Sequence, residues 1–400
     1  MLIPSRLSTE RSLRSTKINA EVRGRLMRSH KRFIALTLCA LMLANIAGCN
    51  KEPEETTVIT TTSSETQAQT EETIETPATS ETTEETEEET EPTYTTPEEP
   101  GNFSEGLQFE AIDKKTAKVV GMGTCKDTKV VIPYETPDGL IVVQIADKAF
   151  TETKITEVIV PESVTTIGNH AFRYCANLTS VRLTDHITSI GSFAFSNCLN
   201  LSYFVMPAGI TKISNSMFMG DLSLKTIIIP DSVTDIEKFA FRDCQSLNII
   251  DIPDGVTSIG EGAFERCKSL EFVKIPESVS YFGNHAFSST GLVSLQIDCR
   301  IVNAYAFYRC KKLEKIAFGE NVIRIECSAF SSCESIIDLN IPDTVEWVDV
   351  GAFSNCTSLT TVTVPQEILG NNKSEVFGGC KGIISVNGKS PKEYFDNWIY

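Results

Sequence analysis

Apolar residues return at a nearly constant interval along most of the chain, and the most regular of them is a phenylalanine that usually follows an alanine. Ten successive intervals between these phenylalanines measure 20 to 24 residues, and seven of them measure 23. Self-similarity at such a period is the signature of a repeat protein, whose units bury their apolar faces only against their neighbours. We therefore predict a solenoid of about 10–11 units, built on Phe150, Phe172, Phe195, Phe218, Phe241, Phe264, Phe287, Phe307, Phe330, Phe353 and Phe377.

Each unit contains two short apolar patterns. Leu178, Val181 and Leu183 have the Leu-x-x-Leu-x-Leu spacing of leucine-rich repeats, and the alternation across 181–183 predicts a short strand. The β-branched stretch 233–236 of a later unit predicts a second strand, and the Ala-Phe-x-x-Cys stretch favours a tight helical turn. The predicted fold is a leucine-rich-repeat solenoid, mainly β, with short parallel strands and helical turns.

The order of residues within a unit resembles a known family. Two units fit the pattern Ile-Pro-x-Ser-Val-Thr-x-Ile-Gly-x-x-Ala-Phe-x-x-Cys-x-x-Leu, except that Glu237 replaces the glycine of one unit and Gly255 the serine of the other. This pattern is similar to the BspA-like leucine-rich repeats of bacterial surface proteins, and it extends over about 130–380. The resemblance implies an N-terminal cap over 101–150, a repeat array over 151–386 and a C-terminal cap over 387–400.

One unit departs from the regular pattern. The interval between Phe287 and Phe307 is 20 residues, and the usual Ile-Pro-x-Ser-Val stretch becomes Asp-Cys-Arg between Ile297 and Ile301. We expect this unit to lack a full second strand and to bend the array.

The N-terminus has the features of an export signal. Basic residues at 28–32 precede an apolar run over 33–47, which is followed by small residues and Cys49. The run is shorter than the roughly 20 residues of a membrane-spanning helix. We assign 1–48 to a signal peptide, with Met27 as an alternative start. The cysteine resembles that of bacterial lipoprotein signals and implies a lipid anchor at Cys49; the alternative is an ordinary signal with an incidental cysteine.

Residues 49–100 consist almost entirely of Thr, Glu, Pro and Ser, with 16 Glu and one Lys. Few apolar side chains and strong like charge predict a disordered segment, either a stalk or a linker without a length requirement. This segment holds most of the formal net charge of −17. Because no basic patch follows it, we predict that the protein does not bind nucleic acid.

Cysteines recur three residues after the phenylalanine in eight units. Export would permit disulfides. The repetition of one position in the unit instead favours buried free thiols. For Cys299 and Cys327, which lie outside that position, a disulfide bridge is the alternative. No Cys-x-x-Cys pair is present, so we predict neither a metal site nor a cofactor. The eight are Cys175, Cys198, Cys244, Cys267, Cys310, Cys333, Cys356 and Cys380.

No sequence motif predicts catalysis. The chain contains no His-Glu-x-x-His, Gly-x-Ser-x-Gly, phosphate loop or dinucleotide fingerprint. His170 and His285 occupy the same position in two Asn-His-Ala-Phe stretches, which indicates repeat residues rather than a site. We therefore do not expect an enzyme.

The outward positions of the first strand are the better candidates for function, because solenoids bind partners on extended faces of this kind. In the middle units these positions form an apolar patch with a polar rim, which is typical of an interaction site. The alternative is that aromatic and β-branched residues simply suit strands. The candidate residues are Tyr203, Val205, Ile228, Ile249 and Phe272, flanked by Arg182 and Lys274.

These observations predict a lipid-anchored cell-surface protein whose array binds an extracellular protein or glycan. The family resemblance implies adhesion. One alternative is an envelope scaffold without a host ligand. Another is an accessory lipoprotein that binds glycans or peptides, in which exposed aromatic residues such as Tyr203, Phe272, Tyr281 or Trp347 would contact a polysaccharide.

Overall fold

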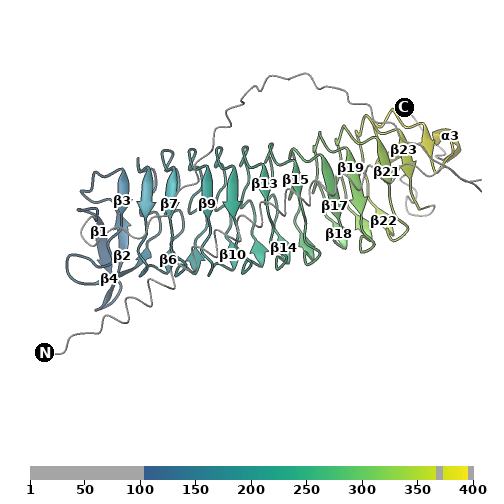
Figure 1. Cartoon of the computed structure of the whole chain (residues 1–400). Coiled ribbons are helices and arrows are strands. Elements are labelled where there is room, and N and C mark those ends of the chain that lie inside the picture. Colours follow the sequence, from purple (N-terminus) through teal and green to yellow (C-terminus); the bar gives the residue numbers. More distant parts are fainter. Residues whose placement is uncertain (1–102, 366–372, 395–400) are drawn as a thin grey trace, which may run out of the picture. The chain divides into compact units, whose positions relative to one another are not determined.

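The computed structural model describes residues 103–365 and 373–394. The predicted signal peptide, Cys49 and the acidic stalk lie outside these residues. The described chain winds into a parallel β-solenoid of about 11 turns, about 23 residues apart, as predicted. Figure 1 shows the turns stacked side by side, so that strands from successive turns form long rows.

One row contains the Leu-x-x-Leu-x-Leu strands, and we call it the first sheet. Its neighbouring strands that form ladders are parallel and one turn apart, with residues such as Tyr203 and Thr226 in register. The strands are β3 (Lys129–Val131), β5 (Glu157–Ile159), β7 (Ser180–Arg182), β9 (Tyr203–Val205), β11 (Thr226–Ile228), β13 (Ile249–Ile250), β15 (Phe272–Val273), β17 (Ser294–Ile297), β19 (Lys315–Phe318), β21 (Asp338–Asn340), β23 (Thr361–Thr363) and β24 (Ser385–Val386).

The other row contains the predicted second strands, and we call it the second sheet. Most of these strands have two residues, of which the second is buried in the core and the first points outward. They are β4 (Ile141–Ile145), β6 (Thr166–Ile167), β8 (Ser189–Ile190), β10 (Lys212–Ile213), β12 (Asp235–Ile236), β14 (Ser258–Ile259), β16 (Tyr281–Phe282), β18 (Ile301–Val302), β20 (Arg324–Ile325) and β22 (Trp347–Val348).

The recurring phenylalanines form one continuous stack in the core, which we call the spine. Every consecutive pair from Phe150 to Phe377 has ring centroids 4.8 to 5.9 Å apart and nearly parallel planes. Aromatic contacts of this kind contribute roughly 0.5–1.5 kcal/mol beyond the burial of apolar area. The stack therefore links each turn to the next, and no unit has a complete core of its own.

The turns around the first ten phenylalanines, Phe150 to Phe353, are not helical, so the predicted helical turns are wrong there, and only Phe377 directly follows a helix. Residues two before and two after the phenylalanine have positive φ, as in His170 at 56° and Tyr174 at 62°. These left-handed residues interrupt the right-handed helical path, and alternate N–H groups donate to the next turn, as Phe172 does to the carbonyl of Ala194 at 2.7 Å. Among the described residues the only helices are the short α2 (Lys373–Val376) and α3 (Pro391–Tyr394).

The repeat cysteines bond to the backbone of the preceding turn. Cys267 Sγ donates to the carbonyl oxygen of Phe241 at 3.1 Å, and Cys244 Sγ donates to that of Phe218 at 3.1 Å. All eight thiols at this position make the equivalent contact with the spine phenylalanine of the turn before. Most of these carbonyls also accept the backbone N–H three residues later, as Phe241 does from Cys244 at 3.1 Å. The thiol therefore gives a buried carbonyl a second partner and ties one turn to the next.

A hairpin lies at the N-terminal end of the described array. Its strands β1 (Gln108–Ala111) and β2 (Thr116–Gly121) are antiparallel, and β2 pairs with β4 of the second sheet. The hairpin thus covers a sheet edge that would otherwise leave backbone groups unpaired.

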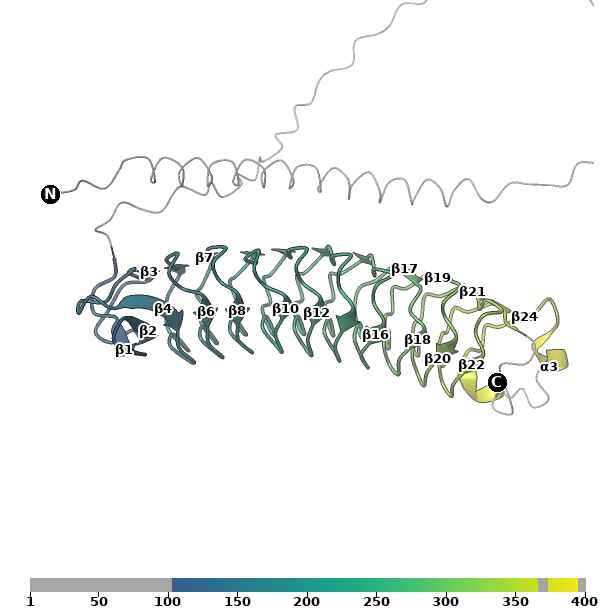
Figure 2. The same ribbon diagram turned by 90° about the horizontal axis from the view of Figure 1, so that it is seen from below.

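The short unit between Phe287 and Phe307 keeps its second strand, so the expectation that this strand is incomplete is wrong. Three residues separate β17 from β18, whereas six separate β11 from β12. Two of the three missing residues fall between the strands, since β17 and β18 begin seven residues apart and β11 and β12 begin nine apart. The third falls between Phe287 and β17, so the deletion affects only connections, where changes of length are tolerated. The ladder of the second sheet is interrupted between β16 and β18, and Figure 2 shows the row of turns bending beyond β16, in agreement with the expected bend.

Candidate functional site: outward surfaces of the two sheets

The first sheet brings the predicted apolar residues into one strip. Val205 of β9 pairs with Ile228 of β11, and Ile249 of β13 pairs with Phe272 of β15. Tyr203 stands at the start of β9 on the same side. The exposed fraction of Ile249 is 47%, and the other four side chains are half-buried. The five residues therefore form an outward apolar strip over four successive strands, in two paired groups, β9 with β11 and β13 with β15. Solvent reaches the strip, and its role in binding stays a prediction.

The two predicted cationic residues flank this strip in different ways. Arg182 Nε lies 3.1 Å from Glu157 Oε1, and Lys129 Nζ approaches the other oxygen of the same carboxylate at 3.8 Å. Lys274 Nζ pairs with Asp254 Oδ1 at 3.0 Å, but both side chains are more than 70% exposed. Pairs so exposed contribute about 0–1 kcal/mol, so the Lys274 ammonium remains available to a partner.

The second sheet carries exposed apolar residues that the first-strand pattern did not predict as a patch. Tyr281 of β16, Ile301 of β18 and Trp347 of β22 occupy the outward position six residues before the spine phenylalanine. Arg324 of β20 stands between Ile301 and Trp347, and its guanidinium lies 5.9 Å from the Trp347 ring centroid. From β6 to β14 the same position holds small or charged residues. Aligning the repeats and comparing this position along the chain would have revealed the change to large apolar residues.

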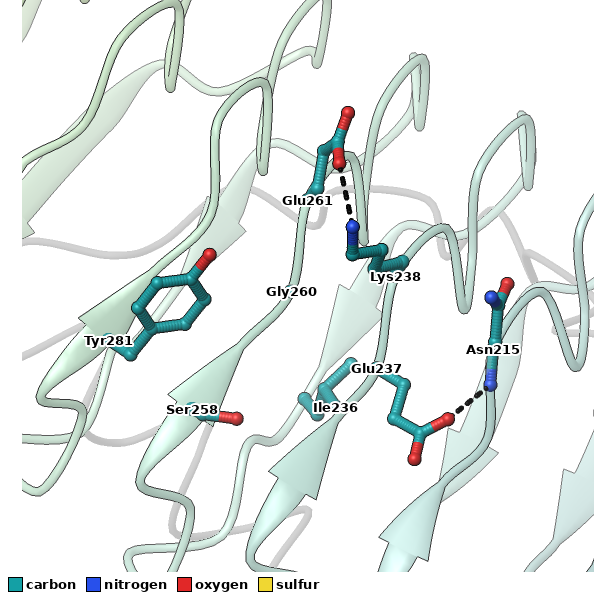
Figure 3. A pocket seen from close by; sticks show the side chains of 8 residues that line it. All are labelled: Asn215, Ile236, Glu237, Lys238, Ser258, Gly260, Glu261 and Tyr281. Atoms are coloured by element: carbon teal, nitrogen blue, oxygen red, sulfur yellow. Dashed lines mark hydrogen bonds and ion pairs between the residues drawn. The ribbon is translucent and has the colours of Figure 1, made fainter.

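A shallow hollow of about 330 Å³ lies on the second sheet beside Tyr281. Figure 3 shows the Tyr281 ring on one side, Ser258 and Gly260 in the middle, and Lys238 and Glu237 across from the ring. The polar groups are held by contacts with one another and with the backbone. Glu237 Oε2, for instance, accepts a hydrogen bond from the backbone N–H of Asn215 at 2.8 Å, in the neighbouring turn.

The repeat histidines are engaged with aromatic neighbours. His170 stacks on Phe193 with ring centroids 4.9 Å apart, and His285 stacks on Tyr305 at 4.8 Å. Desolvation, together with the charges of Arg173 and Lys148, lowers the pKa of His170. These contacts explain why histidine recurs at this position by packing rather than by acid–base chemistry.

One buried acid interrupts the thiol position. Asp221 occupies the place of the cysteine in its turn and has no exposed surface. Its Oδ1 accepts a hydrogen bond from the backbone N–H of Cys198 at 2.8 Å, whereas Oδ2 is buried without a partner. Burial raises the pKa of Asp221 well above its ordinary value.

The cysteines of the described residues are free and almost all buried, which agrees with the expected thiols and leaves the alternative Cys299–Cys327 bridge unformed. Burial raises the pKa of Cys299 to about 12 and that of Cys333 well above its usual range. A thiol in this state is a poor nucleophile, because the thiolate is the reactive form. Within the described part of the chain, no three His, Cys, Asp or Glu residues are grouped to hold a metal ion.

A search over 103–365 and 373–394 also found no helix with the length and apolar character needed to cross a membrane.

Comparison with protein families gives one match. The model described as BspA type leucine rich repeat region matches six copies in this chain, over residues 143–221, 189–303 and 293–400. Together these segments cover more than half of the chain. None of the curated proteins matches.

Several solved bacterial structures are similar to the chain. A leucine rich cell surface protein from Faecalibacterium prausnitzii is 25% identical, with a TM-score of 0.43, over 73% of this chain and 96% of its own. A leucine-rich repeat protein from Bacteroides ovatus is 23% identical, with a TM-score of 0.47, over 74% and 97%. The pneumococcal vaccine antigen PcpA is 18% identical, with a TM-score of 0.46, over 66% and 80%.

Proposed function

The chain belongs to the BspA-type leucine-rich repeat proteins, and we propose that it is a lipid-anchored cell-surface protein whose first sheet binds an extracellular protein. The single observation that carries the binding role is the strip formed by Tyr203, Val205, Ile228, Ile249 and Phe272. A contiguous apolar surface with charged neighbours is typical of interaction sites.

The geometry of the strip suits a protein partner. Within each pair of strands, β9 with β11 and β13 with β15, parallel register places outward side chains about 4.8 Å apart, on a scaffold whose core is a single stack. Such a surface is already ordered before binding, so little conformational entropy is lost when a partner docks. Lys274 at one end adds a charge that steers association, and Ile249, the most exposed of the five, lies within the strip.

The export signal and the acidic segment support the proposed location. A signal that ends at Cys49 would place a lipid at the membrane, and the 51 residues of 50–100 would separate the array from it by tens of ångströms. Replacement of Cys49 by Ala tests the anchor: we expect the protein to appear in the culture medium instead of the membrane fraction, and retention in the membrane would contradict the lipid anchor.

The binding role is tested by capture of the purified protein on immobilised extracellular-matrix proteins. We expect the double variant Tyr203→Ser and Phe272→Ser to lose capture while its thermal transition stays unchanged. The matched control is Asp338→Ser with Thr361→Ser, which changes two outward residues on the polar strands β21 and β23 of the same sheet. Equal capture of the double variant and the wild type would reject the strip as the binding site, and failure of the wild type to bind would favour an envelope scaffold.

A further inference from the structure

The second sheet has an apolar row of its own, on a surface that the proposed function does not use. The exposed fractions of Tyr281, Ile301 and Trp347 are 53%, 38% and 52%, which places them among the most exposed large apolar side chains of the described residues. They belong to β16, β18 and β22, at one repeated outward position, and Arg324 of β20 completes the row. From Tyr281 to Trp347 the row spans four successive turns, and β18, β20 and β22 form one ladder within it.

The hollow beside Tyr281 adds polar groups to one end of this row. Its size, about 330 Å³, is at the small end of the range for ligand pockets. Gly260 lies within it, and a Cβ there would meet the backbone nitrogen of Lys238 at 2.6 Å, so no side chain can fill this place. The ring of Tyr281 borders the hollow opposite Glu237 and Lys238 (Figure 3).

The charged groups around the hollow are paired, and carboxylates outnumber ammonium groups. Lys238 Nζ pairs with Glu261 Oε2 at 3.2 Å, and Lys212 Nζ pairs with Glu237 Oε1 at 2.8 Å. Asp235 adds a third carboxylate, whose Oδ1 accepts a hydrogen bond from Ser258 Oγ at 2.8 Å, so the hollow has no excess of positive charge for an anionic ligand. The ammonium groups and carboxylates are paired with one another or with neighbouring groups. They still offer donors and acceptors close together, in addition to the Ser258 hydroxyl.

This combination selects the chemistry of the ligand. An exposed aromatic ring stacks against a flat apolar face, and paired donors and acceptors satisfy a ligand rich in hydroxyl groups. A pyranose ring has both features, since its C–H groups form an apolar face and its hydroxyls lie around the edge. A row of rings and aliphatic groups that follows the array axis suits several such units in a line.

We propose that the second sheet binds a linear, uncharged polysaccharide, which stacks on Tyr281 and Trp347, passes over Ile301 and Arg324, and hydrogen-bonds to the paired polar groups beside Tyr281. This site goes beyond the proposed protein-binding role of the first sheet. The two are separable, because none of the residues in the row belongs to the first sheet.

Affinity electrophoresis of the purified full-length protein tests the proposal, with laminarin, dextran and galactomannan in the gel as neutral probes and dextran sulfate as an anionic probe. We expect at least one neutral polysaccharide to retard the protein. The variants Tyr281→Ala and Trp347→Ala should each raise the apparent Kd about tenfold or more. Tyr281→Phe, which keeps the ring, should retain most of the retardation.

Two controls separate this site from the first sheet and from unfolding. Tyr203→Ser should migrate like the wild type in the neutral gels, and thermal unfolding should show that all variants remain folded. The proposal is overturned if none of the neutral polysaccharides retards the wild type, if Tyr281→Ala is retarded as strongly as the wild type, or if dextran sulfate alone retards it.

Discussion

The Asp221 carboxylate accepts a hydrogen bond from the backbone N–H of Cys198 at 2.8 Å, in a column where eight other turns place a thiol. In those turns the thiol donates to the carbonyl of the preceding spine phenylalanine. An ionised carboxylate has no proton to donate, and its second oxygen, Oδ2, is buried without a partner. Burial favours the neutral form of Asp221, because the surroundings of Oδ2 offer no hydrogen bond to stabilise an ionised carboxylate.

The first prediction concerns the pH dependence of stability. The pKa of Asp221 is raised on folding from an unfolded value of about 3.9. Its contribution to stability is therefore fully present below about pH 3.9 and declines as the pH rises toward the folded pKa, by up to about 1.4 kcal/mol per pH unit. We expect Asp221→Cys to be more stable than the wild type at pH 7, with the difference shrinking as the pH is lowered to 4.

Urea unfolding of both proteins across this pH range measures the difference, and other carboxylates cancel because the two chains share them. Thr290→Cys is the matched control, since it places a thiol in the same column without removing a charge. A difference between Asp221→Cys and wild type that does not vary with pH would show that Asp221 is not the titrating group.

The second prediction concerns the phenylalanine stack. Phe264 has no exposed surface and lies between Phe241 and Phe287, at 5.3 and 4.8 Å between ring centroids. We expect Phe264→Ala to lower the free energy of unfolding by about 3–5 kcal/mol, because it removes a buried ring and leaves a cavity. Ile249→Ala, at a 47% exposed position, should change it by at most about 0.5 kcal/mol. Equal effects of the two substitutions in chemical denaturation would contradict the stabilising role of the phenylalanine stack.

The third prediction separates the hydrogen bond of a repeat thiol from its volume. Cys267 Sγ donates to the Phe241 carbonyl oxygen at 3.1 Å, and the same oxygen accepts the backbone N–H of Cys244 at 3.1 Å. Cys267→Ala would therefore remove one of two hydrogen bonds to this carbonyl, at a cost of about 0.5–1.5 kcal/mol in addition to the lost volume. Thr290 and Thr153 occupy the same position in other turns and donate through their hydroxyls to the carbonyl of the phenylalanine in their own turn. Because threonine bonds within its own turn, Cys267→Thr should keep most of the side-chain volume but lose the bond to the Phe241 carbonyl. We therefore expect it to be less stable than the wild type in thermal unfolding; a Cys267→Thr variant as stable as the wild type would show that the bond between turns is unimportant.

The fourth prediction concerns the oxidation state of the cysteines. Ten of the eleven cysteines in the described residues are buried, and Cys327 is partly exposed. A thiol reagent should therefore react slowly with the native protein, and first at Cys327, whereas all eleven should react after denaturation without reductant. Fewer than two reactive thiols in the denatured, unreduced protein would contradict free thiols and indicate disulfides.

The architecture could be predicted from the sequence because, in a solenoid, each sequence repeat corresponds to one turn of the structure. The phenylalanine interval predicted the stack, and the Leu-x-x-Leu-x-Leu spacing predicted β7 to within one residue. The tight turns were misread as helical, since Ala-Phe-x-x-Cys is compatible with a helix and the positive φ of bulky residues such as Phe193 and Tyr305 is set by hydrogen bonds between turns. Those hydrogen bonds join residues about 23 positions apart, so the local sequence does not predict them.

The candidate surfaces were predicted less completely. The first-sheet strip followed from alternation within one strand pattern, which fixes which side chains face outward. The second-sheet row was missed as a surface because Tyr281 and Trp347 stand in two-residue strands, too short for alternation to be read. Only the alignment of turns by their phenylalanines brings these residues into one column.

The central claim is that the outward strip of the first sheet is where an extracellular protein docks. Hydroxyl-radical footprinting of the wild type, alone and saturated with a captured matrix protein, tests this claim most directly. We predict that oxidation of Tyr203 and Phe272 falls on binding, while that of Tyr281 and Trp347 is unchanged. Unchanged oxidation of Tyr203 and Phe272 in a complex that is demonstrably formed would contradict the claim.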